Sequence, residues 1–347
     1  MRNVPTLSEA GQHPDLIERV TSHRRAIGDI VQGRDDRLLA IVGPCSAHDP
    51  QGMHEYAARL RLLAAEHSDE LLIVVRVYVE KPRTRHGWPG LLLDPQLDGT
   101  GSAVEGIELA RRMFAAIAAL DLPIANEFVD PYLAPYVSEL VSWAAIGART
   151  VESPVHRRLA SDLPMPVGMK NRADGAIGPA IDAVAVAGRS QPMLNLDAKG
   201  ELRSYHSAGN PNAHLVLRGG DDGPNYSTAH IERSLLELSS SQQNPRLVID
   251  CSHGNSGKDH RRQGAVVEAV CEQVGEGQNG IAGVMLESYL RPGRQALGEP
   301  LEYGVSVTDA CIDIDETSHR LAQLAKAVIA RRYATEARPR HITSVSS

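Results

Sequence analysis

Eight short runs of apolar residues recur along this chain of 347 residues, and they limit its possible folds more than any other feature. Several of them are continuous rather than alternating with polar residues, which is typical of strands that are buried on both faces of a parallel sheet. The runs cover residues 38–42, 71–77, 124–129, 145–151, 166–169, 214–217, 247–249 and 283–286.

Helical patterns lie between many of these runs. In residues 103–120 the apolar side chains recur at spacings of three and four, and residues 317–331 show the same stripe with Leu321, Leu324 and Val328. An alternation of strand and helix repeated eight times predicts a (β/α)8 barrel, the TIM barrel. A doubly wound open sheet is the competing architecture.

Some segments lie outside this repeat. Residues 1–35 precede the first strand and are predicted as an N-terminal extension with a helix over about 16–31. Residues 36–332 form the predicted catalytic barrel, and residues 333–347 a polar tail that we expect to be mobile. The segment 195–212 is polar and long for a connection between a strand and a helix. We interpret it as an insertion that serves oligomer contacts or regulation.

The composition excludes several classes of protein. A formal net charge of −7 argues against a nucleic-acid-binding protein, which would present a basic surface. No apolar stretch reaches the roughly 18 residues of a membrane helix, and charges near the N-terminus leave no signal-peptide core. The cysteines lie far apart without a CxxC pair, at Cys45, Cys251, Cys271 and Cys311. We therefore expect a soluble, cytoplasmic protein without nucleic-acid or membrane partners.

Cations follow the predicted strands at the end where a barrel places its active site. They are Arg76, Lys81, Arg83, Arg149, Lys170 and Arg218. Such a group would repel itself unless anions neutralised it, and one phosphate needs only two or three such donors. The set therefore indicates two phosphate-bearing substrates, or one phosphate and a carboxylate.

A second set at the strand ends combines a thiol, an imidazole and two carboxylates, namely Cys45, His253, Glu287 and Asp309. This mixture suits a borderline divalent transition metal better than magnesium, which prefers oxygen ligands alone. Taken singly, each residue more often packs, caps or pairs with a neighbour, and the shared position in the barrel is what favours a site. The residues alone thus predict metal-assisted chemistry on phosphorylated small molecules and leave the reaction open.

These motifs resemble those of the type I 3-deoxy-D-arabino-heptulosonate 7-phosphate (DAHP) synthases, in order, from about residue 15 to residue 332. The motifs include Gly43-Pro44-Cys45-Ser46, Glu80-Lys81-Pro82-Arg83-Thr84, Gly147-Ala148-Arg149-Thr150, Lys170-Asn171, Arg218-Gly219-Gly220, Ile249-Asp250-Cys251-Ser252-His253, Glu287-Ser288 and Thr308-Asp309-Ala310-Cys311. The resemblance implies that phosphoenolpyruvate condenses with erythrose 4-phosphate and water to give DAHP and phosphate. This transferase reaction opens the shikimate pathway to chorismate and the aromatic amino acids.

The resemblance also implies a role for each motif residue. Phosphoenolpyruvate would be held by Arg76, Lys81, Gly147, Ala148, Arg149, Lys170 and Arg218. Erythrose 4-phosphate would be held by Lys81, Pro82, Arg83, Thr84 and Asp309. One divalent transition metal ion (Mn, Fe, Co or Zn) would be bound by Cys45, His253, Glu287 and Asp309. The catalytic residues would be Lys81, His253 and Asp309. We expect a homo-oligomer, either a dimer or a tetramer.

Departures from the family pattern bear on regulation. Regulated members usually carry serine in the loop before the fifth strand, where this chain has Pro164 within residues 161–165. The acidic N-terminal segment that helps them to bind an aromatic amino-acid inhibitor is missing from residues 1–15. We therefore expect weak or no inhibition by phenylalanine and tyrosine, as in a copy that serves secondary metabolism.

Three alternatives stay open at this point. The 3-deoxy-D-manno-octulosonate 8-phosphate synthases share the barrel and the chemistry, but they have a Lys-Ala-Asn-Arg loop where this chain has Lys81-Pro82-Arg83-Thr84. A synthase that uses a variant aldose phosphate, such as an aminated sugar, would carry the same motifs. A non-catalytic regulatory paralogue would be supported by a decayed site, whereas every matching position is intact here.

Overall fold

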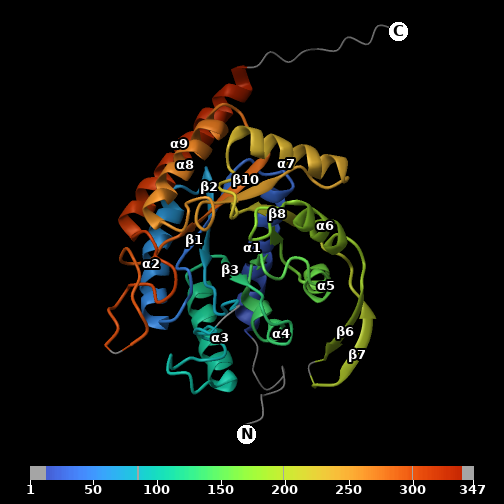
Figure 1. Cartoon of the computed structure of the whole chain (residues 1–347), viewed down its shortest axis with the longest axis vertical. Helices are drawn as coiled ribbons and strands as arrows, with labels where there is room; N and C mark the ends of the chain where they lie inside the picture. Colours follow the sequence, from blue (N-terminus) through green and yellow to red (C-terminus); the bar gives the residue numbers. More distant parts are fainter. Residues whose placement is uncertain (1–12, 84–85, 198, 299, 338–347) are drawn as a thin grey trace.

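A closed barrel of eight parallel strands forms the centre of the molecule (Figure 1). The computed structural model describes residues 13–83, 86–197, 199–298 and 300–337. Around the barrel the strands follow the order β1-β10-β9-β8-β5-β4-β3-β2, and β1 pairs with both β10 and β2. The predicted (β/α)8 barrel is confirmed, and the open doubly wound sheet is wrong. The strands are β1 Leu38–Gly43, β2 Leu71–Arg76, β3 Ile124–Glu127, β4 Trp143–Ile146, β5 Val167–Lys170, β8 Ala213–Leu217, β9 Leu247–Asp250 and β10 Ile281–Glu287.

Helices connect the strands and surround the barrel (Figure 1). They are α2 Pro50–Glu66, α3 Ala103–Ala119, α4 Ala134–Val137, α5 Pro154–Asp162, α6 Gly178–Ala187, α7 Thr228–Ser240, α8 Gln263–Gly275 and α9 Ile314–Ala337, with short 3-10 turns at Ser138–Leu140 and His260–Arg262. The helical patterns predicted over 103–120 and 317–331 are therefore confirmed as α3 and α9. Among the described residues, no helix combines the length and the apolar character needed to cross a membrane.

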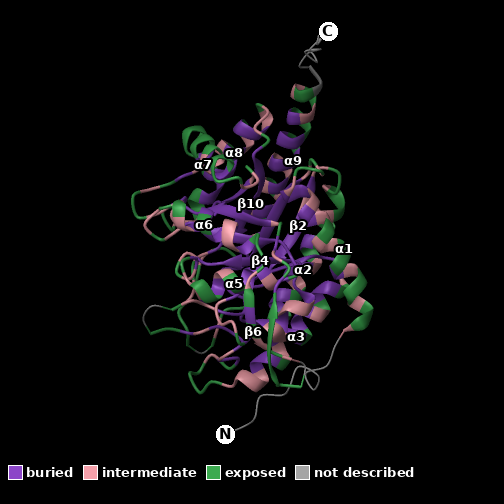
Figure 2. Cartoon of the chain, turned by 90° about the vertical axis from the view of Figure 1, so that its right-hand side faces the viewer, coloured by how far each residue is buried: buried purple, intermediate pink, exposed green. Residues whose placement is uncertain are grey.

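Strand residues alternate between two buried layers, which explains why the apolar runs are continuous in the sequence. In β1, Leu39 and Ile41 belong to the cluster that fills the barrel interior, together with Trp143. Leu38 and Ala40 belong to the cluster between the strands and the surrounding helices. Figure 2 shows this distribution, with buried residues on the strands and on the helix faces that cover them.

The N-terminal helix α1 (Pro14–Val31) packs against the barrel interior. Its Ile27, Ile30 and Val31 are fully buried and join the same cluster as the inward-facing strand residues. The helix predicted over about 16–31 is thus confirmed. Its apolar residues close the amino-terminal end of the barrel, and this leaves the carboxyl ends of the strands as the open mouth.

The polar segment 195–212 contains strand structure that the sequence analysis did not predict. Strands β6 (Pro192–Leu196) and β7 (Leu202–His206) form an antiparallel hairpin outside the barrel (Figure 1). Asp197 closes the turn, because its carboxylate accepts hydrogen bonds from the backbone N–H groups of Lys199 and Glu201. Every residue of β7 is exposed. The strands were missed because most side chains of β7 are polar and because, of the two strands, only Met193 is buried.

Two predicted boundaries differ from the structure by about five residues, and the others by at most three. Strand β4 begins at Trp143 and ends at Ile146, whereas residues 147–151 form a turn in which Gly147 accepts from the N–H groups of Thr150 and Val151. Val151 is buried in the outer layer, so its apolar character reflects packing rather than strand structure. Helix α9 continues to Ala337, so the predicted tail is helical over 333–337, and residues 338–347 lie outside the described residues.

Candidate active site

The mouth of the barrel brings together the two residue sets that the sequence singled out. Arg76, Lys170 and Glu287 are the last residues of their strands, and Cys45 follows β1 by two positions. Because all eight strands run in the same direction, their carboxyl ends meet at one end of the barrel. Residues that lie far apart in the sequence therefore come into contact there.

Three of the four predicted metal ligands form one compact group. The ligand atoms of Cys45, Glu287 and Asp309 all lie within 4.8 Å of one another, and Cys45 Sγ is 3.7 Å from Asp309 Oδ2. His253 lies at the edge of this group, with Nε2 3.8 Å from Glu287 Oε1. Its backbone is in the left-handed region at φ 52°, a costly conformation for a non-glycine residue that is found preferentially at functional sites.

The chemistry of these donors fits a transition-metal ion. Burial and the nearby Glu287 raise the pKa of the Cys45 thiol, so the thiolate needs a positive charge beside it. Lys81 supplies one, since its Nζ is 3.1 Å from Cys45 Sγ and also donates to the Cys45 carbonyl at 3.0 Å. A bound cation would displace the thiol proton. A thiolate with an imidazole and carboxylates is a donor set for a borderline metal rather than for magnesium.

Arg76 lies beneath this group and is surrounded by protein acceptors. Its Nη2 pairs with Glu287 Oε1 at 2.8 Å, and its Nε donates to the Pro44 carbonyl at 3.1 Å. The guanidinium carbon also lies 3.9 Å from the centroid of the Tyr78 ring. Burial alone would raise the pKa of Glu287, but His253 and Arg76 outweigh it and lower that pKa to about 2. Arg76 therefore keeps Glu287 ionised and oriented, a role that the sequence analysis did not assign to it.

Two other cations at the mouth, Arg149 and Arg218, lie near enough to interact electrostatically. In the part of the chain that the structure describes, neither Arg149 nor Arg218 forms an ion pair. Arg149 is exposed, whereas Arg218 is largely buried and donates to the Gly219 carbonyl at 3.1 Å. Burial and the positive charge of Arg149 lower the pKa of Arg218, although Asp250 opposes them. Paired guanidinium groups of this kind provide a binding site for a phosphate.

Gly147 provides space for a carboxylate that the sequence analysis did not use. A Cβ atom at position 147 would lie 2.1 Å from Glu127 Oε1, so any other residue there would force the Glu127 carboxylate to move. Glu127 is the last residue of β3 and is buried. Its place at a strand end was the signal that could have identified it. Ala148 and Arg149 follow in the same turn and bring backbone and side-chain donors to the mouth.

The loop after β2 contains the residues that were predicted for the second phosphate. Lys81 and Pro82 are partly buried, and the backbone N–H of Lys81 donates to the Pro89 carbonyl at 2.9 Å. Arg83 is exposed, with its Nε donating to the Trp88 carbonyl at 2.8 Å. Thr84 lies outside the described residues. Asp309, predicted for both the metal and this substrate, is exposed at the same mouth.

Three asparagines connect the loops after β5, β8 and β9. Asn171 accepts from the backbone N–H of Arg218 at 2.7 Å, and Asn225 accepts from that of Gly219 at 2.8 Å. Asn255 in turn accepts from the backbone N–H of Asn225 at 2.8 Å. These buried side chains hold the loops of Lys170, Arg218 and His253 in one fixed arrangement.

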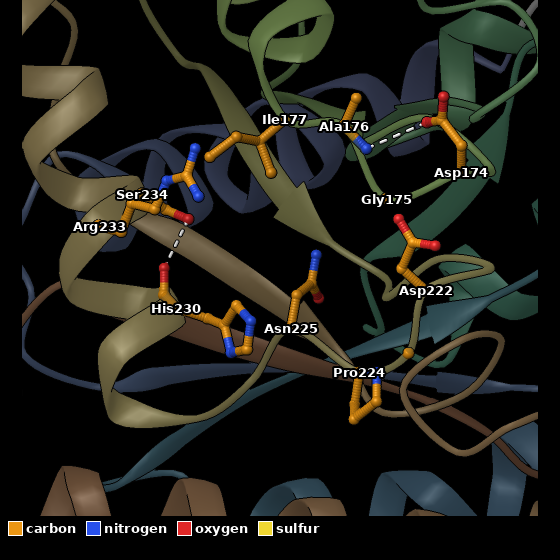
Figure 3. A pocket seen from close by; sticks show the side chains of 11 residues that line it. Asp174, Gly175, Ala176, Ile177, Asp222, Pro224, Asn225, His230, Arg233 and Ser234 are labelled. Atoms are coloured by element: carbon orange, nitrogen blue, oxygen red, sulfur yellow. Dashed lines mark hydrogen bonds between the residues drawn. The ribbon is translucent and has the colours of Figure 1, made fainter.

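A hollow of about 420 Å³ lies behind these loops, between the β5 and β8 loops and α7 (Figure 3). Asn225 projects toward it in Figure 3, with Asp174 and Asp222 on one side and His230 and Arg233 on the other. Asp174 pairs with Arg172 at 2.6 Å, and Arg233 pairs with Glu237 at 2.8 Å. Two of the charges that line the hollow, Asp174 and Arg233, are therefore already paired within the protein.

The fold and the mouth define a (β/α)8-barrel enzyme for anionic substrates, and comparisons with known proteins specify the family. The chain belongs to the DAHP synthetase I family, which it matches over residues 12–322. It is 47% identical over 332 residues to the phospho-2-dehydro-3-deoxyheptonate aldolase of Corynebacterium glutamicum, covering 93% of this chain and 90% of the relative. It is also 47% identical over 315 residues to the Phe-sensitive enzyme of that name from Escherichia coli, covering 90% of each chain.

A solved structure agrees with this assignment. The phospho-2-dehydro-3-deoxyheptonate aldolase of Francisella tularensis superposes with a TM-score of 0.93 at 41% identity, covering 96% of this chain and 98% of that chain. The family resemblance expected from the motifs is therefore confirmed.

Proposed function

We propose that the protein condenses phosphoenolpyruvate with erythrose 4-phosphate and water to give DAHP and phosphate. The main support is the meeting of two groups at one barrel mouth. Arg149 and Arg218, which form no ion pair with any described residue, lie at the same mouth as Cys45, Glu287 and Asp309. Two anionic substrates and a metal ion account for both sets. The names of the relatives in the family agree with this reaction.

Phosphoenolpyruvate is held, in this proposal, by the cations on the β4, β5 and β8 side of the mouth. Arg149 and Arg218 bind its phosphate with Lys170, and the backbone of Gly147 and Ala148 assists them. Arg76 and Lys81 add positive charge for the carboxylate. Bidentate guanidinium groups fix the orientation of the substrate as well as its charge, and this aligns the enol carbon with the second substrate.

Erythrose 4-phosphate lies on the β2 side, with its phosphate on Arg83 and Thr84 and its aldehyde toward Lys81 and Asp309. When bound by Cys45, His253, Glu287 and Asp309, a divalent ion (Mn, Fe, Co or Zn) supplies Lewis acidity for an aldehyde oxygen. Lys81 donates a hydrogen bond, and then a proton, to the oxygen that gains charge as the carbon–carbon bond forms. Water then adds to the carbon of phosphoenolpyruvate that carries the phosphate. Arg149, Lys170 and Arg218 hold this phosphate as it leaves.

The first prediction concerns this reaction directly. We expect metal-stripped protein to release phosphate from phosphoenolpyruvate only when both erythrose 4-phosphate and manganese are added. Arabinose 5-phosphate, the substrate type of the octulosonate branch, should give no release because the loop at Lys81 carries the Pro82-Arg83 pair. A phosphate-release assay with each sugar, with and without manganese, measures this.

The alternatives give different results in the same assay. Release with arabinose 5-phosphate alone would identify a 3-deoxy-D-manno-octulosonate 8-phosphate synthase. If folded, manganese-loaded protein released no phosphate with either sugar, the result would contradict the proposed reaction. It would favour a synthase that uses a variant aldose phosphate, or a non-catalytic regulatory paralogue.

The second prediction is weak feedback inhibition. Helix α5, which lines a hollow of about 790 Å³ with the hairpin strand β6, runs directly into the loop of Pro164. Proline has neither the hydroxyl nor the N–H that serine would offer a bound amino acid, so we expect 1 mM phenylalanine or tyrosine to lower the rate by less than about twofold. Strong inhibition by submillimolar phenylalanine would refute this, and the Pro164→Ser variant shows whether the hydroxyl alone restores sensitivity. Weak inhibition would suit a copy that serves secondary metabolism.

The third prediction is that the protein is a homo-oligomer, a dimer or a tetramer, which associates through the hairpin. The register places Leu194, Leu196 and Leu202 on one face, with exposed fractions of 66%, 45% and 62%. A second copy covering this face would bury apolar surface that is otherwise exposed to water. Light scattering after size exclusion should show an oligomer for the native protein and a smaller species for Leu194→Glu combined with Leu202→Glu. Leu236→Glu, at a 67% exposed site on α7, is the matched control. An unchanged mass for the double variant would reject this interface.

All four cysteines are free, as in proteins of a reducing compartment. This is the support for the cytoplasmic location that we propose.

A further inference from the structure

One carboxylate oxygen contacts both residue sets of the mouth. Asp250, the last residue of β9, is fully buried. Its Oδ2 accepts a hydrogen bond from Lys170 Nζ at 2.9 Å and lies 2.9 Å from His253 Nδ1. Lys170 belongs to the proposed phosphoenolpyruvate site, and His253 to the proposed metal site. The sequence pattern predicts no role for Asp250.

The surroundings of Asp250 hold its carboxylate in place. Oδ1 accepts from the backbone N–H of Ser252 at 3.0 Å, and the Asp250 carbonyl accepts from Asn255 Nδ2 at 2.9 Å. Asp250 is also in register with Met285 of β10. A carboxylate fixed by these contacts thus stands between the two proposed sites.

Lys170 and His253 compete for the negative charge of Oδ2, because both lie beside this one oxygen. A cation bound at Nε2 of His253 polarises the imidazole, which increases the positive charge at Nδ1 and its attraction to Asp250. The hydrogen bond from Lys170 then contributes less to the stability of the Asp250 carboxylate. The Lys170 ammonium can therefore move toward a substrate phosphate with a smaller loss of free energy. Conversely, a phosphate that attracts Lys170 leaves the charge of Asp250 to His253, which makes the imidazole a better metal ligand.

We propose that Asp250 is a positioning residue that couples the binding of the metal ion to the binding of phosphoenolpyruvate, so that each ligand tightens the other. This inference rests on the proposed function, because it takes His253 as a metal ligand and Lys170 as a phosphate ligand. Such coupling is reciprocal: the factor by which the metal tightens the substrate equals the factor by which the substrate tightens the metal.

Calorimetric titrations of native protein and of Asp250→Asn test the coupling. Phosphoenolpyruvate is titrated into metal-free and manganese-loaded protein, and manganese is titrated with and without phosphoenolpyruvate. In the native protein we expect each ligand to tighten the other by about tenfold, and in Asp250→Asn by less than about twofold. Glu139→Gln, which breaks the half-buried pair with Arg111 at 2.8 Å, is the matched control and should keep the native factor.

A merely structural role for Asp250 gives a different result. With a structural role, the affinities for manganese and for phosphoenolpyruvate would both fall in Asp250→Asn, while the coupling factor stayed at its native value. The coupling factor would also stay unchanged if direct contact between the metal and the substrate produced the coupling. Either outcome overturns the inference. The phosphate-release assay on native protein distinguishes a failure of the coupling from a failure of the proposed function. Native protein that binds no phosphoenolpyruvate and releases no phosphate would overturn both the coupling and the proposed function.

A second measurement needs no change at Asp250. In native, metal-free protein with ¹⁵N-labelled histidine, phosphoenolpyruvate should shift the imidazole signals of His253, because Lys170 leaves Asp250. The His253→Gln variant assigns those signals. Unchanged His253 signals at saturating phosphoenolpyruvate would overturn the coupling.

Discussion

Replacing Cys45 with serine is expected to weaken manganese binding by at least about 100-fold and to lower phosphate release in proportion. Even the loss of a residue that only hydrogen-bonds to a metal ligand typically lowers metal affinity by about 10- to 100-fold. The serine hydroxyl stays protonated at neutral pH, so it replaces an anionic, polarizable ligand with a neutral one. Glu287 and Asp309 would remain within reach of a cation but without the thiolate. The fold should persist, because serine is close to cysteine in size and Lys81 stays beside it.

Metal titrations against a chelating indicator measure the affinity, and the thiolate-to-metal charge-transfer absorption of the cobalt form reports the bond itself. Cys271→Ser, on helix α8 and partly buried, is the matched control and should bind metal normally. If Cys45→Ser kept both the native affinity and the absorption band, Cys45 would not be a ligand, and the assignment of the metal site would have to move to other residues.

The fold could be predicted from the sequence because burial on two sides leaves a clear pattern. In β1, neighbouring residues such as Leu39 and Ala40 enter different apolar layers, so a continuous run results. The hairpin of β6 and β7 has no such layers. Its strands are held by backbone pairing and by the Asp197 turn, and neither leaves an apolar pattern in the sequence.

The candidate site could be predicted only in part. Positions such as Cys45 and Lys170 follow from the rule that strand ends meet at one mouth. Contacts between side chains do not follow from that rule. Arg76 belongs by its charge to the phosphate-binding cations, yet its guanidinium pairs with Glu287. Asp250 ends a buried strand, but its contacts with Lys170 and His253 depend on the arrangement of two neighbouring strands and a loop.

Replacing Lys81 with arginine is expected to lower turnover by at least about 100-fold, the usual loss when a proton donor is removed, while phosphoenolpyruvate binding changes by less than about threefold. Burial alone would lower the pKa of Lys81, but Cys45 and Glu287 outweigh it and keep the ammonium protonated. Arginine keeps the positive charge that supports substrate binding. It does not give up a proton at neutral pH, and its planar group cannot occupy the place of Nζ between the Cys45 thiol and carbonyl.

Separate measurements of binding and turnover distinguish the possible roles of Lys81. Calorimetry gives the affinity for phosphoenolpyruvate, and steady-state phosphate release gives kcat and the KM for each substrate. Lys326→Arg, exposed on helix α9, is the matched control and should leave all of these unchanged. A loss confined to kcat supports proton donation, because that interaction develops only in the transition state. A variant that turned over at the native rate would refute this role, and a loss confined to the KM for erythrose 4-phosphate would reduce Lys81 to a binding residue.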